Sequence, residues 1–112
     1  MANFRKTYGC PVEFSVDLLG GKWKSVILAR LKQKPLRYGE VRRLIPALSD
    51  KVLTERLHSL CQSGLLEQVV QDGIMHYRLS AQGETLRPVL QALYDWGEAN
   101  AGPLGAKIQL QE

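Results

Sequence analysis

The side chains able to do redox or acid–base chemistry are two cysteines and two histidines. Cys10 and Cys61 lie far apart, outside any CxxC spacing, and two thiols are too few for a disulfide framework. His58 and His76 have no partnered carboxylate or nucleophile at a recognisable motif, and no glycine-rich phosphate loop is present. The sequence therefore predicts no enzyme, no metal site and no cofactor, and any cysteine chemistry would be regulatory.

Basic side chains are concentrated in one part of the chain. Residues 22–58 hold ten Lys or Arg against three acids, a net charge of +7, whereas residues 59–112 hold three basic residues against six acids, a net charge of −3. This asymmetry predicts one region that faces a polyanion and a second region that does not. From charge alone, an ordinary solvated basic face is the alternative.

The apolar pattern predicts helices and one hairpin that could position these charges. Pro11 precedes a short helix over 13–19, Gly20-Gly21 ends it, and a core helix follows over 22–31. The remaining elements are expected in this order: an extended Leu36-Arg37, a short helix over 38–45, a longer helix that Ser49 caps and Gly64 closes, a hairpin, and a long helix that Pro88 kinks or restarts.

The dipeptide Asp72-Gly73 predicts a two-residue hairpin turn between strands at 66–71 and 74–80. Such a turn pairs positions whose numbers sum to 145. The side expected to be buried carries Leu66 with Leu79, Gln68 with Tyr77, and Val70 with Met75. The outward side carries Glu67 with Arg78, Val69 with His76, and Gln71 with Ile74.

This order of elements predicts a mainly α (α+β) fold, a winged helix-turn-helix with a two-stranded wing. The whole chain, 1–112, is expected to form one domain with a recognisable core over about 10–97. Its tail, 102–112, has no clear period and is expected to be flexible.

Three stretches of the chain form a recognisable set: CPVEFSVDLLGGKWKSVILARL, PLRYGEVRRLIPALSDKVLTERLHSLCQSGLLEQ and HYRLSAQG. They resemble consecutive motifs of the HxlR family of regulators. The combination is specific, although any one of these motifs alone would be weak. The resemblance implies a dimeric bacterial transcription regulator whose first and last helices form the two-fold interface. It also implies pseudo-palindromic operators and, in many members, a response to oxidants or electrophiles.

Double-stranded DNA is the expected partner, and the longer helix is the element expected to enter the major groove. Lys51, Thr54, Glu55 and His58 are its candidates for contacts to bases, each with a plain solvated role as the alternative. Ser49 and Asp50 flank them, and a role only as a helix cap is the alternative for Ser49. Phosphate contacts are predicted for Arg37, Arg42 and Arg43, ahead of Arg56, and for His76 and Arg78 on the wing.

A homodimer is expected because the first and last helices carry more apolar surface than one small domain requires. Packing of both helices within the monomer is the alternative. The predicted interface residues are Val12, Val16, Leu19, Leu86, Val89, Leu90, Leu93, Tyr94 and Trp96.

Two interpretations of Cys10 stay open. At the start of a helix and near Arg5 and Lys6 its thiolate would be favoured, and it matches the redox-responsive cysteine of several family members. The other interpretation is a packed, inert cysteine, which is also the simplest view of Cys61. Trp23 and Trp96 are expected in apolar packing rather than in a ligand pocket, so a small-molecule or oxidant effector is left unidentified.

No apolar run is long enough to cross a bilayer and the N-terminus lacks a signal-peptide pattern, so a cytoplasmic location without a membrane partner is expected. A winged helix used only for protein contacts is the main rival function, and the net charge of +7 argues against it. A MarR-type regulator is the nearest rival within the same class, but such chains carry longer helical extensions at both ends.

Overall fold

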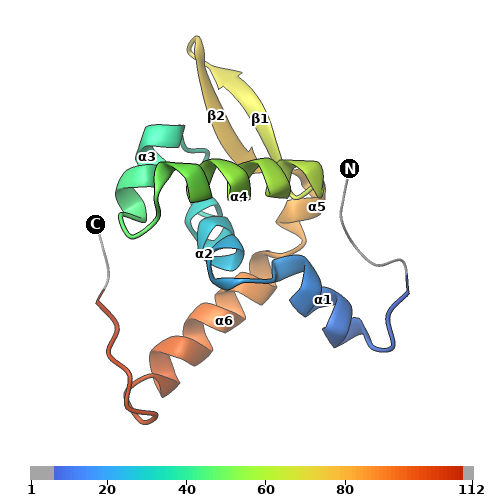
Figure 1. Ribbon diagram of the computed structural model, residues 1–112, viewed down its shortest axis with the longest axis vertical. Helices are drawn as coiled ribbons and strands as arrows, with labels where there is room; N and C mark the ends of the chain where they lie inside the picture. Colours follow the sequence, from blue (N-terminus) through green and yellow to red (C-terminus); the bar gives the residue numbers. More distant parts are fainter. Residues whose placement is uncertain (1–6, 110–112) are drawn as a thin grey trace.

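The computed structural model describes residues 7–109, which form six helices and one two-stranded antiparallel sheet (Figure 1). In chain order the elements are α1 (Pro11–Leu19), α2 (Lys22–Leu31), α3 (Tyr38–Leu44), α4 (Asp50–Gln62), β1 (Leu66–Gln71), β2 (Ile74–Leu79), α5 (Ala81–Glu84) and α6 (Arg87–Asn100). The predicted winged helix-turn-helix order is confirmed. Pro88 lies in the first turn of α6, so it restarts the last helix rather than kinking it.

Local signals in the sequence explain where several elements begin and end. The Ser49 hydroxyl accepts a hydrogen bond from the Val52 N–H at 3.1 Å, as expected of a helix cap. Gly64 closes α4 with a φ of +87°, a conformation that favours glycine. Leu36 pairs with Tyr77 through two backbone hydrogen bonds of 3.0 and 2.8 Å, which confirms the short extended piece before α3.

The hairpin has the predicted register throughout, from Leu66 opposite Leu79 to Gln71 opposite Ile74. Asp72 and Gly73 both have positive φ, 53° and 76°, as the tightest hairpin turn requires. One expectation is wrong: of the side predicted to be buried, Gln68, Val70 and Met75 are exposed. Figure 1 shows the reason, because the wing projects away from the helices and, among the described residues, no helix covers its tip.

Leucine and isoleucine side chains from α2, α4 and α6 fill the core. Ile27, Leu28, Leu53 and Leu57 are almost completely buried, and Leu90 of α6 is only 2% exposed. Leu90 therefore belongs to the monomer core, which corrects its expected place in a dimer interface. The burial follows from the tilt of α6, which brings its first turns against α2.

The first and last helices lie at the end of the molecule opposite the wing (Figure 1). No residue of α1 is buried, and only Leu18 and Leu19, at its end, pack against the core. After α6 a turn over 101–105 is closed by a bond from the Ala106 N–H to the Ala101 carbonyl. The expected flexibility of the tail, 102–112, remains a prediction, and its last three residues lie outside the described part of the chain. Among residues 7–109 no helix is both long and apolar enough to cross a membrane.

Candidate nucleic-acid interface

The polar side of α4 forms an exposed surface because its apolar side is anchored in the core. Leu53, Leu57 and Leu60 are buried along the inner side of the helix. The outer side carries the predicted base-contact candidates and their neighbours, all exposed: Ser49, Asp50, Lys51, Thr54, Glu55 and His58. Within residues 7–109 the side chains of Lys51 and His58 have no hydrogen-bond or ion-pair partner, so both are available to a ligand.

Helix α3 and the Arg37 residue that precedes it present three arginines in three different states. Glu40 accepts a hydrogen bond from the Arg37 backbone N–H at 2.8 Å, and this bond lowers the pKa of the Glu40 carboxyl. The Arg37 side chain lies 3.5 Å from the same carboxylate. Arg43 is exposed, and no described residue pairs with it. Arg42 is half-buried and donates from Nε to Asp50 Oδ1 at 2.9 Å.

The Arg42–Asp50 pair changes the status of two residues that the sequence analysis treated as separate DNA contacts. Tyr38 joins them: its hydroxyl donates to the same Asp50 Oδ1 at 2.9 Å and lies 3.4 Å from Thr54 Oγ1. The hydroxyl bond and the Arg42 bond lower the pKa of Asp50, so this carboxylate stays ionised in neutral solution. Sequence reasoning missed Tyr38, for which the only signal was a polar atom on an otherwise apolar position.

On the wing, Arg78 and Glu67 face each other as predicted, and Arg78 Nε donates to Glu67 Oε2 at 2.7 Å. The Arg78 charge is therefore already paired. His76 lies opposite Val69 as predicted; it is half-buried, and its Nδ1 lies 2.9 Å from the Ile74 carbonyl oxygen. It lies at a hollow of about 290 Å³ between the wing tip and the loop before α3, lined also by Lys34 and Arg37.

The two cysteines have different surroundings. Cys10 is exposed and occupies the position just before α1, where its side chain makes no capping hydrogen bond. Arg5 and Lys6, which supported a sensor role, lie outside the described residues. Cys61 is half-buried against the core, and this burial raises the pKa of its thiol. Among the described residues no group of three His, Cys, Asp or Glu side chains could hold a metal ion.

The segment before α1 is fastened to that helix by polar and aromatic contacts. The Tyr8 hydroxyl donates to Asp17, and the Gly9 N–H donates to Glu13 Oε1 at 2.9 Å. The Tyr8 and Phe14 rings meet edge to face, 5.2 Å apart. Glu13 and Asp17 therefore hold this segment in place, in addition to their expected role near a helix N-terminus.

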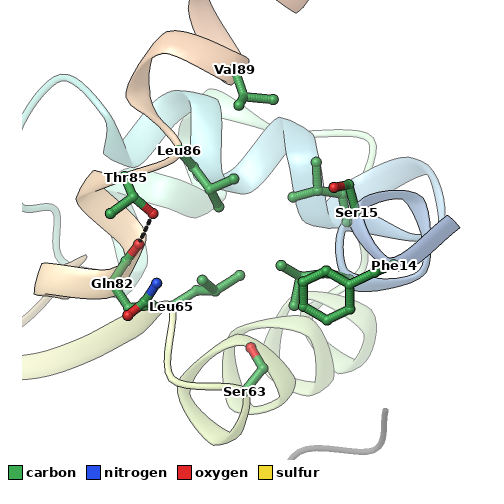
Figure 2. Close-up of a pocket in the computed structure, with 10 residues that line it drawn as sticks. Phe14, Ser15, Ser63, Leu65, Gln82, Thr85, Leu86 and Val89 are labelled. Atoms are coloured by element: carbon green, nitrogen blue, oxygen red, sulfur yellow. Dashed lines mark hydrogen bonds between the residues drawn. The ribbon is translucent and has the colours of Figure 1, made fainter. Parts of the chain in front are cut away.

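A pocket of about 350 Å³ separates α1 from the start of α6 (Figure 2). Phe14 and Ser15 line it from α1, and Leu65, Leu86 and Val89 line it from the other side. Its hydroxyl groups are already used within the chain: Ser15 donates to the Pro11 carbonyl, and Thr85 donates to the Gln82 carbonyl. Trp23 and Trp96 are not among its lining residues: Trp23 packs partly against the core, as expected, whereas Trp96 is exposed rather than packed.

Helices α1 and α6 also carry a set of exposed apolar side chains. Six of the nine predicted interface residues belong to it: Val12, Val16, Val89, Leu93, Tyr94 and Trp96. Of these six, only Val89 lines the pocket. Leu19 and Leu86 are half-buried and pack partly against the core. We call the six exposed residues the α1/α6 apolar face.

Comparison with known proteins identifies the family to which this chain is related. A family model described as HxlR-like helix-turn-helix matches residues 18–104. An HTH-type transcriptional regulator of Methanothermobacter thermautotrophicus is 39% identical over 94 residues, covering 81% of this chain and 72% of the relative. The HTH-type transcriptional regulator YybR of Bacillus subtilis is 35% identical over 95 residues, covering 82% of this chain and 76% of the relative.

Two solved structures have a similar fold. The reduced form of the redox regulator HypR superimposes with a TM-score of 0.77 at 34% identity, covering 85% of this chain and 97% of that one. The reduced form of the transcriptional regulator YodB from Bacillus subtilis superimposes with a TM-score of 0.71 at 32% identity, covering 86% and 98%.

Proposed function

The chain belongs to the HxlR-like helix-turn-helix family of DNA-binding transcriptional regulators, and from that premise we propose that it binds a pseudo-palindromic operator as a homodimer. Helix α4 is the reading element, α3 positions it on the DNA backbone, and a two-fold axis repeats both. The alternative of a winged helix that contacts only proteins is not favoured by these relatives.

The observation that carries the proposal is the exposed side of α4. The helix has 13 residues, a length of about 20 Å, and its inner side is anchored by buried leucines. A helix of this size fits the major groove of B-form DNA. Lys51 and His58 reach outward without partners in the described chain, so their hydrogen-bonding groups lose no internal bond when they meet base edges.

Phosphate contacts are proposed for the basic residues beside α4. Arg43 is the strongest candidate because it is exposed and no described residue pairs with it. Arg37 and His76 border one polar hollow beside the wing and would contact the backbone together. Arg78 contributes less to binding, since Glu67 already neutralises it.

The α1/α6 apolar face supports the homodimer. A nine-residue helix without a buried side chain, such as α1, gains little stability from its own backbone hydrogen bonds. Packing against a second copy supplies the missing burial. Helices α1 and α6, which carry this face, lie at the end opposite the wing (Figure 1). A dimer formed through them would leave both reading helices uncovered.

Cys10 is the proposed oxidant-responsive group. Its thiol is exposed at the start of α1, next to the α1/α6 apolar face, whereas Cys61 is half-buried. HypR, a structural neighbour, is a redox regulator, which supports a similar response here. Peroxide would convert the Cys10 thiol to a sulfenic acid with release of water, and dithiothreitol would reduce this sulfenic acid back to the thiol, giving water and oxidised dithiothreitol.

The DNA-binding proposal predicts two different kinds of loss. Arg43→Ala should weaken binding to every duplex and reduce the slope of log affinity against log salt by about 0.9, because one phosphate contact disappears. Lys51→Ala and His58→Ala should mainly reduce the preference for the selected site, by roughly 1–3 kcal/mol each if they contact bases. Fluorescence anisotropy with a duplex selected by the wild-type protein, against an unrelated duplex of equal length, measures both.

Equal losses on both duplexes for all three variants would contradict this division between reading and positioning. A wild-type protein with no preference among sequences would instead favour the protein-contact function.

The redox proposal predicts that peroxide abolishes binding to the selected duplex and that dithiothreitol restores it. Cys10→Ser should bind like the untreated wild type and ignore peroxide, because the reacting sulfur is gone. Cys61→Ser is the matched control, since it removes the only other cysteine and should keep the peroxide response. A mobility shift at fixed salt reads out both, and a Cys10→Ser protein that still loses binding would remove Cys10 from the mechanism.

A further inference from the structure

A polar cluster joins α3 to the first two turns of the proposed reading helix. Asp50 Oδ1 accepts two hydrogen bonds of 2.9 Å, one from the Tyr38 hydroxyl and one from Arg42 Nε. The Tyr38 oxygen also lies 3.3 Å from the Asp50 carbonyl oxygen and 3.4 Å from Thr54 Oγ1. We call Tyr38, Arg42, Asp50 and Thr54 the α3–α4 cluster.

An ionised carboxylate in this position opposes DNA binding when considered alone. Asp50 is the first residue of α4, where backbone N–H groups otherwise favour a phosphate, and its side chain is 76% exposed. Its negative charge repels the phosphates that α3 and α4 would approach. A direct contact to a cytosine amino group would have to use Oδ2 as the acceptor, because Oδ1 already accepts two bonds.

The bond to Arg42 gives the carboxylate a different use. Arg42 Nε is occupied by Asp50, and in the described chain its two terminal nitrogens have no partner. An arginine held at Nε keeps its guanidinium plane fixed and presents the opposite edge, which suits a phosphate. The Tyr38 ring packs against the core, which fixes the position of the hydroxyl group that donates a hydrogen bond to Asp50.

We propose that Asp50 and Tyr38 are positioning residues that aim Arg42 at a DNA phosphate, and that Asp50 reads no base. This inference rests on the proposed DNA-binding function. It predicts that removal of the Asp50 carboxylate weakens DNA binding, whereas simple charge repulsion predicts that the same change strengthens it.

A double-mutant cycle on DNA tests the proposal. The probes are a duplex selected by the wild-type protein from a random-sequence library and an unrelated duplex of equal length, titrated by anisotropy at several NaCl concentrations. Arg42→Ala should weaken binding about eightfold at 0.1 M salt and lower the salt slope by about 0.9, the values for one lost phosphate contact. Asp50→Ala should weaken binding in the same direction on both duplexes.

The double variant Arg42→Ala/Asp50→Ala should bind no more weakly than Arg42→Ala, because Asp50 acts through Arg42. Asp50→Asn keeps an acceptor oxygen and should lose less affinity than Asp50→Ala. Tyr38→Phe keeps the packed ring and should cause a smaller loss, which disappears in the Arg42→Ala background. Thermal unfolding followed by circular dichroism checks that each variant is folded at the titration temperature.

Several results would overturn the positioning role alone while the wild type still binds the selected duplex. They are Asp50→Ala binding as tightly as the wild type or more tightly, losses that multiply in the double variant, and a Tyr38→Phe loss that persists without Arg42. A loss for Asp50→Ala confined to the selected duplex would show that Asp50 reads a base. A selection in which the wild-type protein enriches no duplex that it binds more tightly than the unrelated one would overturn the proposed function together with this inference.

Discussion

Replacing Gly83 by alanine is expected to lower the free energy of unfolding by about 3 kcal/mol, although the same change in most helices is stabilising. Gly83 is buried in α5, and a Cβ there would lie 2.1 Å from the Leu65 carbonyl oxygen. That oxygen is backbone, and it also accepts the Ser80 N–H at 3.0 Å, so it cannot swing aside. Denaturant titration followed by circular dichroism measures the loss.

The clash is costly because α5 links the wing to α6. The Gly83 N–H donates to the Ser80 hydroxyl oxygen at 3.0 Å, and that hydroxyl in turn donates to the Gly64 carbonyl at 2.6 Å. Moving α5 away from Leu65 would stretch this chain of bonds and shift the start of α6. A loss of about 3 kcal/mol is a large fraction of the 5–15 kcal/mol typical of a small domain.

Gly39→Ala is the matched control for Gly83→Ala. Gly39 lies in α3, is exposed, and a Cβ there would have no neighbour within 4 Å. Its substitution should leave stability unchanged or raise it by about 0.5 kcal/mol through helix propensity. If both variants unfolded at the same denaturant concentration, the close approach of Gly83 to Leu65 would not exist in solution.

Local signals allowed most of the fold to be predicted from the sequence. The turn at Asp72-Gly73 determined the wing register, because its length leaves only one pairing. The cap at Ser49 placed the start of α4 for the same kind of local reason. Burial at the wing tip was mispredicted, since alternation within a strand does not say how far the hairpin extends beyond the core.

For the candidate site, the sequence correctly predicted which side chains of α4 are exposed. The pairing of Arg42 with Asp50 was missed because it depends on the angle between α3 and α4, which local patterns do not encode. Leu90 was misplaced for a related reason. It shares the stripe of Val89 and Leu93, and only the tilt of α6 against α2 determines which members of that stripe are buried.

Gly83 illustrates a third limit of sequence reasoning. In the chain it follows Ser80 as an ordinary residue of a short helix, and its φ lies outside the positive range that would mark a turn glycine. A side chain at this position is excluded by the backbone carbonyl of Leu65. Leu65 precedes the wing in the sequence, whereas Gly83 follows it. Close approaches between distant segments leave no periodic signal.

Leu93→Glu is expected to convert the proposed homodimer to a monomer at micromolar concentration and to reduce affinity for the selected duplex by about 10²-fold. Leu93 is 53% exposed at the middle of the apolar stripe on α6, between Val89 and Trp96. In a two-fold dimer each substitution occurs twice at the same interface, so dimerisation would desolvate two carboxylates and would be strongly disfavoured. Light scattering after size-exclusion chromatography measures the mass, and anisotropy measures the affinity.

Val70→Glu is the control for the Leu93→Glu prediction, because Val70 is an equally apolar, exposed residue on the wing, at the other end of the molecule. It should leave the dimer mass unchanged, since an added acid far from the interface desolvates nothing there. The loss of affinity in Leu93→Glu follows from the loss of the second half-site, so binding to a single half-site duplex should be preserved. A dimer that survives Leu93→Glu would place the two-fold interface away from α6 and leave the exposure of its apolar stripe without an explanation.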